Sequence, residues 1–425
     1  MTGTQMQVAA INWHVYLLTG SPLALGFVGL TRVIPIIAFS LWGGILADRY
    51  DRRRVMLVTQ SQLTLLAATL GAATFLQRDT VWLLYFLNAL SATVTAFDAP
   101  ARQSLVPRLV PAADLPGALS LNLTVLHAAT ICGPALAGLM IAGTGAVFAP
   151  KAAMAIAASA GVAGAGPTAG IGWIYAVNAV SFLAAIAALL RMHPDAGRPA
   201  AEQASLPAWG ALKDGLRFVF TTPLMVWTMA LDFFATFFAG SMSLLPIFAD
   251  QVLGCGPVGY GLLVAAPALG ALIGSVYTTL WPLAPRQGRV FLWSVAAYGV
   301  ATIVYGLSRS YTLTFIALAG TGLADLVSTV IRQTLRQLIT PDAMRGRMTS
   351  VNMIFFMGGP QLGEMEAGIV ASLFASVATG AIVSVVSGGV GTLAVVAIIA
   401  AASPVVRRFD LTEALRSGPG SGTAA

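Results

Sequence analysis

The chain has 425 residues, of which 57% are hydrophobic and only 9% are charged, and its mean hydropathy is +0.83. Soluble domains carry roughly 25% charged residues, so the composition excludes a soluble globule and indicates an integral membrane protein. The net charge of +7 does not indicate nucleic-acid binding, because the basic residues fall in short loops between apolar runs.

Apolar runs of the length needed to cross a bilayer, about 20 residues, recur along the whole chain. The first run is short, with polar residues among Met1 to Gln5, so we expect part of its N-terminal half to be missing. We predict an all-α integral membrane protein with twelve transmembrane helices, at residues 3–19, 22–47, 55–76, 81–97, 117–141, 171–190, 223–249, 258–281, 290–307, 312–331, 349–374 and 380–402.

The distribution of basic residues predicts the orientation, because cytoplasmic loops carry an excess of Lys and Arg. Nineteen of the 23 basic residues fall in loops after even-numbered spans or in the C-terminal tail. Loops after odd-numbered spans hold only Arg78, Lys151 and Arg309. We therefore expect a multi-pass membrane protein with both termini in the cytoplasm.

Two longer stretches between spans organise the chain. Residues 142–170 are rich in Gly and Ala and are predicted to be a flexible outer loop, since a thirteenth span there would invert every later loop. The inner loop 191–222 divides the spans six and six. We predict an N-terminal six-helix bundle (1–190), a cytoplasmic linker (191–222), a C-terminal six-helix bundle (223–402) and a disordered cytoplasmic tail (403–425).

The two halves repeat each other in sequence. Arg102-Gln103-Ser104-Leu105 returns as Arg332-Gln333-Thr334-Leu335, and Gly133 and Gly138 return in register as Gly363 and Gly368. A parallel repeat of six spans is typical of a transporter made of two bundles with its site between them.

The loop between the second and third spans carries Gly44, Asp48, Arg49, Arg52 and Arg53. This stretch resembles the G-x-L-A-D-R-x-G-R-R signature of the major facilitator superfamily, with Asp51 in place of the second Gly. The resemblance implies a cytoplasmic latch that holds the outward-facing state, in which Asp48 faces a helix N-terminus and the arginines bridge to carboxylates. The alternative is an ordinary basic turn.

The fifth span contains Gly133-Pro134-Ala135-Leu136-Ala137-Gly138. It resembles the G-P-x-x-G-G motif of exporters in this superfamily, in which small residues let the fifth and eighth spans pack closely. The stretches 97–103, 331–347 and 362–368 resemble the bacterial branch that includes the enterobactin (siderophore) exporter and related drug efflux proteins. That resemblance covers nearly the whole chain. It implies secondary active transport in the bacterial cytoplasmic (inner) membrane, usually outward and often driven by proton antiport.

Four acidic residues inside predicted spans are candidates for proton coupling: Asp232, Asp325, Glu364 and Glu366. Asp232 is the best placed, because it is near the membrane midplane with no basic residue nearby in sequence, and desolvation disfavours its ionised form. Asp325 is two helical turns from Arg332, which predicts a link through water or backbone rather than a direct ion pair. For each acid the alternative is a static hydrogen bond between helices.

Further candidates concern the substrate cavity. Arg32 and Glu364 match in depth, so we predict an ion pair between them, and Gln361 shares the helix face of Glu364. Trp13, His14 and Phe234 could line an apolar cavity, although packing residues at these positions would produce the same pattern.

No phosphate-binding G-x-x-x-x-G-K-[ST] loop and no catalytic or metal-ligand constellation is visible, so we expect neither an enzyme nor a cofactor. The expected partners are a small-molecule substrate, protons and the lipid bilayer, without nucleic acid, and the protein is expected to be a monomer. The leading hypothesis is a proton-coupled exporter of small amphipathic molecules. The alternatives are an importer or uncoupled facilitator of the same fold, and a sensor or inactive paralogue.

Overall fold

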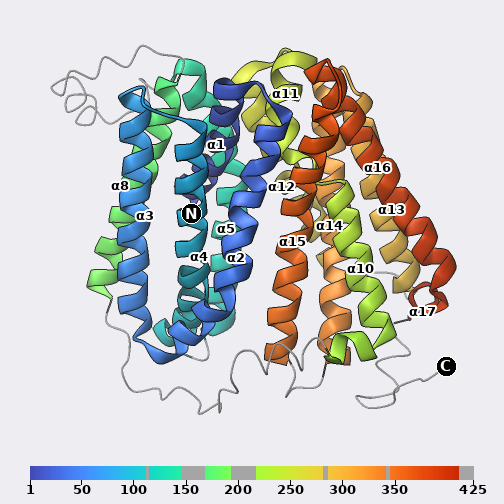
Figure 1. Cartoon of the computed structure of the whole chain (residues 1–425). Coiled ribbons are helices and arrows are strands. Elements are labelled where there is room, and N and C mark those ends of the chain that lie inside the picture. The colour runs from blue at the N-terminus through green and yellow to red at the C-terminus, as the bar shows by residue number, and fades with distance from the viewer. Residues whose placement is uncertain (112–113, 145–167, 193–216, 281–285, 341–344, 411–425) are drawn as a thin grey trace. The chain divides into compact units, whose positions relative to one another are not determined.

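The computed structural model describes residues 1–111, 114–144, 168–192, 217–280, 286–340 and 345–410, which are helical with short connections and contain no strand (Figure 1). The first half of the chain forms α1 (Thr2–Thr19), α2 (Pro22–Arg49), α3 (Arg52–Phe75), α4 (Val81–Leu109), α5 (Leu115–Leu139) and α8 (Ala169–Arg191). The second half forms α10 (Pro223–Phe238), α11 (Leu245–Ile247), α12 (Gly256–Leu280), α13 (Gln287–Leu307), α14 (Tyr311–Ile339), α15 (Arg345–Ser372), α16 (Val377–Ala402) and α17 (Pro404–Arg408).

Each predicted span coincides with helical structure. Within the described residues, ten segments are long and apolar enough to cross a membrane. The other two predicted spans correspond to α1 and α15, which are helices but fall outside that set. Ten spans are thus supported by length and composition, and the count of twelve stays a prediction.

The chain packs as two compact units. Unit 1 contains residues 1–205 and 243–265, and unit 2 contains residues 206–242 and 266–425. The residues from Ser243 to Ala265 therefore pack with the N-terminal helices, although they follow α10 in sequence. Packing units need not coincide with sequence repeats, so the predicted domain boundaries stay a prediction.

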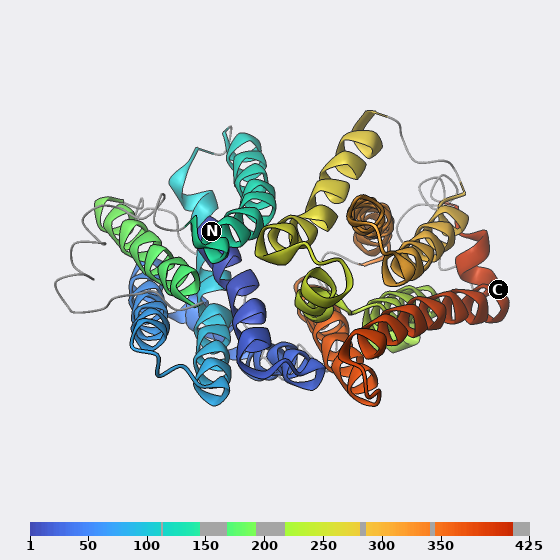
Figure 2. The same ribbon diagram turned by 90° about the horizontal axis from the view of Figure 1, so that it is seen from above.

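Helix neighbours within the two units follow one scheme (Figures 1 and 2). In unit 1, α1 packs on α5 and α8, while α3 packs on α4 and α8. In unit 2, α10 packs on α15 and α16, while α13 packs on α14 and α16. These four contacts correspond between the halves, with α1, α3, α4, α5 and α8 matching α10, α13, α14, α15 and α16, which agrees with the sequence repeat.

The predicted seventh span, 223–249, is not one continuous helix. The helix α10 ends at Phe238, and the chain continues through Gly240 into a short 3₁₀ turn, α11 and a π-helical turn that ends at Val252. Glycine is a poor helix former, and Pro246 lacks the N–H that a continuous helix would need at that position. The predicted span thus falls within the candidate span Pro223–Val252, but its helix is interrupted after Phe238.

The ends of two helices and the C-terminal tail differ from the prediction, and two predicted loops lie largely outside the described residues. The helices α4 and α14 continue beyond the predicted span ends at 97 and 331, so Arg102 and Arg332 lie on helices rather than in loops. The tail is not irregular from residue 403, because Pro404–Arg408 form α17 and Val406 is buried. The predicted outer loop lies mostly, and the predicted linker largely, outside the described residues.

Candidate functional site

A buried ion pair joins two helices of unit 2. The guanidinium of Arg332 on α14 contacts the carboxylate of Asp232 on α10. Both side chains are largely buried, with 7% and 12% of their surfaces exposed. No basic residue lies near Asp232 in sequence, but α10 and α14 bring Arg332 into contact with it, so the expectation that no basic group holds Asp232 ionised is wrong.

Arg332 also contacts a second carboxylate. Its Nη2 lies 3.6 Å from Oδ1 of Asp325, whose side chain is 48% exposed. The same Nη2 donates to the hydroxyl of Thr329 at 2.8 Å, and Nε donates to the carbonyl of Ser328 at 3.3 Å. The link from Asp325 to Arg332 is therefore direct, in contrast to the expected link through water, because the arginine side chain folds back along its own helix.

The charge balance of this cluster matters for its chemistry. Removing a charge from water costs several kcal/mol unless a partner compensates it. One guanidinium compensates one carboxylate, so the cluster of Asp232, Arg332 and Asp325 has one carboxylate in excess when both acids are ionised. Binding of one proton would neutralise it, which is the property that a proton-coupling site needs.

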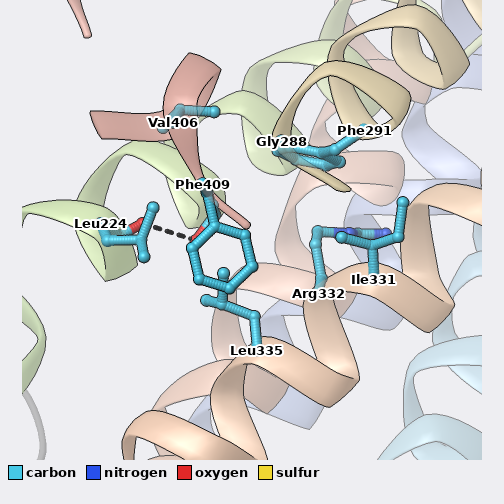
Figure 3. Close-up of a pocket in the computed structure, with 9 residues that line it drawn as sticks. Leu224, Gly288, Phe291, Ile331, Arg332, Leu335, Val406 and Phe409 are labelled. Carbon is cyan, nitrogen blue, oxygen red and sulfur yellow. Dashed lines mark hydrogen bonds between the residues drawn. The ribbon is translucent and has the colours of Figure 1, made fainter. Parts of the chain in front are cut away.

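A small cavity lies beside this cluster (Figure 3). It has a volume of about 10 Å³ and is lined by Arg332 together with Leu224, Thr228, Gly288, Phe291, Ile331, Leu335, Val406 and Phe409. This volume holds at most one water molecule. Its walls are mostly apolar, and its volume is far below the several hundred Å³ of a typical ligand site.

The remaining acidic candidates lie on α15. Glu364 and Glu366 are both half-buried. Arg32 belongs to unit 1 and Glu364 to unit 2, so the ion pair predicted between them stays a prediction. The Oε1 atom of Gln361, on the same helix, is buried and has no hydrogen-bond partner among the described residues. A buried acceptor without a partner costs free energy, and a donor from a ligand or a water molecule would satisfy it.

Phe234 is part of an aromatic cluster in unit 2. Its ring packs edge-on against Phe233, with 5.4 Å between centroids, and Phe233 also contacts Phe237 and Phe355. Phe234 itself is 45% exposed, whereas α10 and α15 hold the others together. An exposed ring beside a packed cluster suits contact with an apolar molecule or with lipid.

His14 and Trp13 are buried in unit 1 rather than lining an open space. His14 is fully buried; its Nε2 lies 2.6 Å from Asp79 and its Nδ1 lies 3.1 Å from the Tyr175 hydroxyl. A neutral imidazole that donates from Nε2 and accepts at Nδ1 satisfies both partners. Trp13 is 4% exposed and packs on Tyr260, with 5.0 Å between ring centroids. Both side chains therefore have structural partners, as the alternative interpretation expected.

The neighbouring Tyr16 ties the end of α1 to the segment that follows the break in the seventh span. Its hydroxyl donates to Asp250 at 2.5 Å, and Gln251 donates to the same hydroxyl at 3.1 Å. Tyr260 also donates to the backbone carbonyl of Ala9 at 2.9 Å. These bonds explain why residues 243–265 pack with unit 1.

The span-5 motif provides close helix contacts on two sides. A Cβ at Gly133 would lie 2.6 Å from Cβ of Gln5 on α1. A Cβ at Gly138 would lie 2.5 Å from the carbonyl oxygen of Pro257 and 3.0 Å from Cα of Gly261, both on α12. The predicted close packing of the fifth and eighth spans is confirmed, and Pro134 lies inside α5 as expected.

The loop motif is described only in part. Gly44, Asp48 and Arg49 lie in the last turns of α2, where the side chains are outside the described set, so the role of Asp48 stays a prediction. Arg53 donates from Nε and Nη2 to the carbonyls of Leu189 and Leu190, both at 2.7 Å, and so caps the C-terminus of α8. Arg52 is half-buried at the start of α3.

Asp51 has a clear role in the same turn. It is the N-cap of α3, and its side chain accepts a hydrogen bond from the backbone N–H of Arg54 at 3.0 Å. Aspartate is among the preferred N-cap residues. The residue that departs from the family signature therefore stabilises the helix start without a positive φ.

A family model described as "Transmembrane secretion effector" matches residues 1–160 and 150–416 of the chain. The chain belongs to the transmembrane secretion effector family of the major facilitator superfamily. This family membership agrees with the loop motif, the span-5 motif and the repeat described above, and it makes the protein a membrane transporter rather than an enzyme.

The curated relatives of the chain include enterobactin exporters. The chain is 25% identical over 408 residues to the enterobactin exporter EntS of Shigella boydii serotype 18, covering 94% of this chain and 86% of the relative. The same identity and coverage hold for EntS of Escherichia coli O1:K1.

Solved structures show the same fold. A bacterial homologue of the human lysosomal transporter Spinster aligns with a TM-score of 0.72 at 15% identity, over 96% of this chain and 97% of that one. A D-xylose–proton symporter aligns with a TM-score of 0.69 at 12% identity, over 96% and 97%. At these identities the likeness supports the fold alone.

Several acidic side chains make contacts that the sequence alone did not indicate. Asp98 on α4 is 4% exposed and accepts hydrogen bonds from Thr59 at 2.8 Å and Gln60 at 2.9 Å, both on α3. Asp79 and Asp250 were also missed, because both lie near span ends, where an acid needs no explanation. The one available signal for Asp98 was its place four residues before Arg102, which it approaches at 3.9 Å.

Proposed function

We propose that the protein is a proton-coupled exporter of small amphipathic molecules that works by alternating access in the cytoplasmic membrane. The observation that carries this proposal is the cluster of Asp232, Arg332 and Asp325 in unit 2. It provides a buried site with one surplus carboxylate, which can be emptied and filled by a single proton.

Strongly interacting acids titrate as a unit, so the proton belongs to the cluster rather than to one residue. Asp232 contacts the guanidinium of Arg332 directly and is largely buried, whereas Asp325 lies 3.6 Å from it and its side chain is 48% exposed. Asp325 is therefore the entry point for the proton, and Asp232 holds Arg332 in place. Glu364 and Glu366 come next as coupling candidates.

The outward direction and the substrate class rest on the relatives. EntS proteins are exporters of enterobactin, and the same direction is proposed for this chain. The exposed Phe234 beside its aromatic cluster, and the buried unpartnered Oε1 of Gln361, favour a molecule with both apolar and polar parts. The sequence orientation, with the C-terminus in the cytoplasm, is part of the proposal.

The test begins with a substrate-protection screen in an efflux-deficient bacterial host. A protected compound is then followed in proteoliposomes or everted vesicles with an imposed pH gradient. We expect wild-type protein to move the compound uphill, and Asp232→Asn and Asp325→Asn to bind it but lose gradient-driven movement. Asp51→Asn is the matched control, because it replaces an acid outside the cluster and asparagine retains the N-cap.

Each rival function predicts a different result. An uncoupled facilitator would equilibrate the compound without responding to the gradient, and an importer would accumulate it in the opposite direction. An inactive paralogue would neither protect the host nor move any compound. Gradient-driven efflux that survives in both Asp232→Asn and Asp325→Asn would exclude the cluster as the coupling site.

A further inference from the structure

The chain after the last span folds back onto the start of α13. We call residues Ser403–Phe409 the C-terminal strap; it consists of α17 and its two flanking residues. Ser403 begins the strap one residue after α16 ends, and its hydroxyl accepts from the N–H of Val406 at 3.4 Å. Val406 is 1% exposed and joins an apolar cluster with Leu231, Phe291 and Ile331.

Gly288 is the docking point for the strap. Its N–H donates to the carbonyl of Phe409 at 3.0 Å. A Cβ at this position would overlap the carbonyl oxygen of Val406, so only glycine permits the close approach. Figure 3 shows Val406 and Phe409 of the strap close to Gly288 and Phe291.

Docking of the strap gathers four arginines. Arg407 and Arg408 form the last turn of α17, and Arg286 and Arg289 flank Gly288. All four side chains are exposed, and none belongs to an ion pair among the described residues. The bond from Gly288 to Phe409 brings the two segments that carry these pairs together, and Asp410 follows directly after the strap.

Four exposed arginines that lie on adjacent segments can bind an anion. Guanidinium groups that approach within about 10 Å of each other repel at ordinary salt concentration, and an anion between them would offset that repulsion. Guanidinium groups match phosphate oxygens in a two-pronged geometry. Two other arginines differ from these four in having protein partners, because Arg53 caps α8 and Arg332 pairs with Asp232.

The place of the cluster indicates which anion. The helix α16 is long and apolar enough to cross the membrane, and the strap starts directly after it. The strap therefore lies at the membrane boundary, where Val405 is 42% exposed next to Arg407 and Arg408. By the orientation predicted from the loops, this boundary belongs to the cytoplasmic leaflet, which attracts basic segments through its anionic lipids.

We propose that the C-terminal strap and the start of α13 form a binding site for the headgroup of an anionic phospholipid, with Arg286, Arg289, Arg407 and Arg408 as its ligands. The lipid phosphate sits among the guanidinium groups and lowers the repulsion that docking creates. The site is independent of what the protein transports.

The test uses the purified full-length protein in nanodiscs of phosphatidylcholine, with and without phosphatidylglycerol. We measure retained lipid by native mass spectrometry and the midpoint of thermal unfolding. Wild-type protein should retain phosphatidylglycerol selectively and unfold at a higher temperature in its presence. The variant R407Q/R408Q should bind phosphatidylglycerol roughly tenfold more weakly or worse, because each arginine near an anionic surface contributes about 1 kcal/mol.

Two further variants make the test specific. The control R54Q/R191Q removes two exposed arginines from the same predicted face and should retain the lipid effect. Gly288→Ala keeps all four charges but prevents docking, so it should lose the selective binding. Val406→Ser loosens the strap more gently and should weaken the binding if Gly288→Ala does not fold.

Three outcomes would overturn the proposal. One is an unchanged phosphatidylglycerol effect in R407Q/R408Q, and another is an equal loss in R54Q/R191Q, which would indicate a general attraction of basic loops. The third is full competition by inorganic phosphate at the same concentration, which would indicate a site for the free anion.

Discussion

The guanidinium of Arg332 on α14 contacts the carboxylate of Asp232 on α10, and this ion pair is the most buried one in unit 2 among the described residues. It joins a residue that the sequence assigned to a loop with one that the sequence treated as isolated. A substitution that neutralises one residue of such a pair leaves the charge of the other buried without its partner.

Asp232→Asn should therefore lower the free energy of unfolding by about 3 kcal/mol, the low end for a broken buried pair, because Arg332 keeps Asp325 as a second contact. Arg332→Gln alone should cost a similar amount. The double variant should cost less than the sum of the two, since no charge then remains unpaired. Denaturant unfolding of the purified proteins measures the cycle, and additive losses would contradict the ion pair.

Asp325→Asn should behave differently. The 48% exposure of its side chain and its 3.6 Å separation from Arg332 predict a loss of stability below about 1 kcal/mol. In transport, the same change should remove the response to a pH gradient while leaving substrate binding intact. A wild-type pH profile from well-folded Asp325→Asn protein would assign the proton to another acid, with Glu366 next.

The N-cap of α3 offers a small and clean test. Asp51→Ala should lower stability by about 1 kcal/mol, because the N–H of Arg54 loses its acceptor. Asp51→Gly, which restores the residue of the family signature, should cost only a few tenths of a kcal/mol. Thermal unfolding compares the two, and an equal loss in both variants would contradict the capping role.

The contact between α5 and α12 should be intolerant of larger side chains. Gly138→Val would force branched atoms toward the carbonyl of Pro257, only 2.5 Å from the position of a Cβ. Overpacking costs typically 1–3 kcal/mol, so we expect reduced yield of folded protein and reduced transport. Gly143→Ala serves as the comparison, because nothing lies within 4 Å of its Cβ, although its φ of +86° adds backbone strain.

Cys255 provides a test of topology and of local electrostatics. Burial, together with the nearby charge of Asp250, raises the pKa of the Cys255 thiol. Less thiolate is then present at neutral pH, so a maleimide should react slowly at pH 7 and faster as the pH rises. In a Cys132→Ser background, a membrane-impermeant reagent should label Cys255 from outside the cell, and labelling only from inside would contradict the predicted orientation.

The sequence predicted the helices well and their contacts poorly, for physical reasons. A span needs a continuous apolar run, so α2, α8 and α16 can be recognised from their apolar sequences alone. The repeat of neighbours followed from the repeated stretches around Arg102 and Arg332. Ion pairs between helices depend on which faces meet, and a single sequence holds no information on that for Asp232 or Asp250.

The break in the helix after α10 could not be predicted, because the residues that follow it are as hydrophobic as a span. The residues from Gly240 to Val252 are apolar enough to continue a span, and only Gly240 and Pro246 signalled an interruption. Both residues are common in transmembrane helices, so the signal was weak. The strap was missed because a short segment that begins Ser403-Pro404 directly after a span and carries two arginines is typical of an irregular end.

The single positive charge between two carboxylates has a consequence for the energy source. On the proposed mechanism, one proton moves inward for each neutral molecule that leaves, so each cycle transfers one net charge across the membrane. Such a charge is worth about 2.3 kcal/mol per 100 mV of membrane potential. A voltage that is negative inside would then drive efflux even when the pH is equal on both sides, and a charged substrate would change that contribution by its own valence.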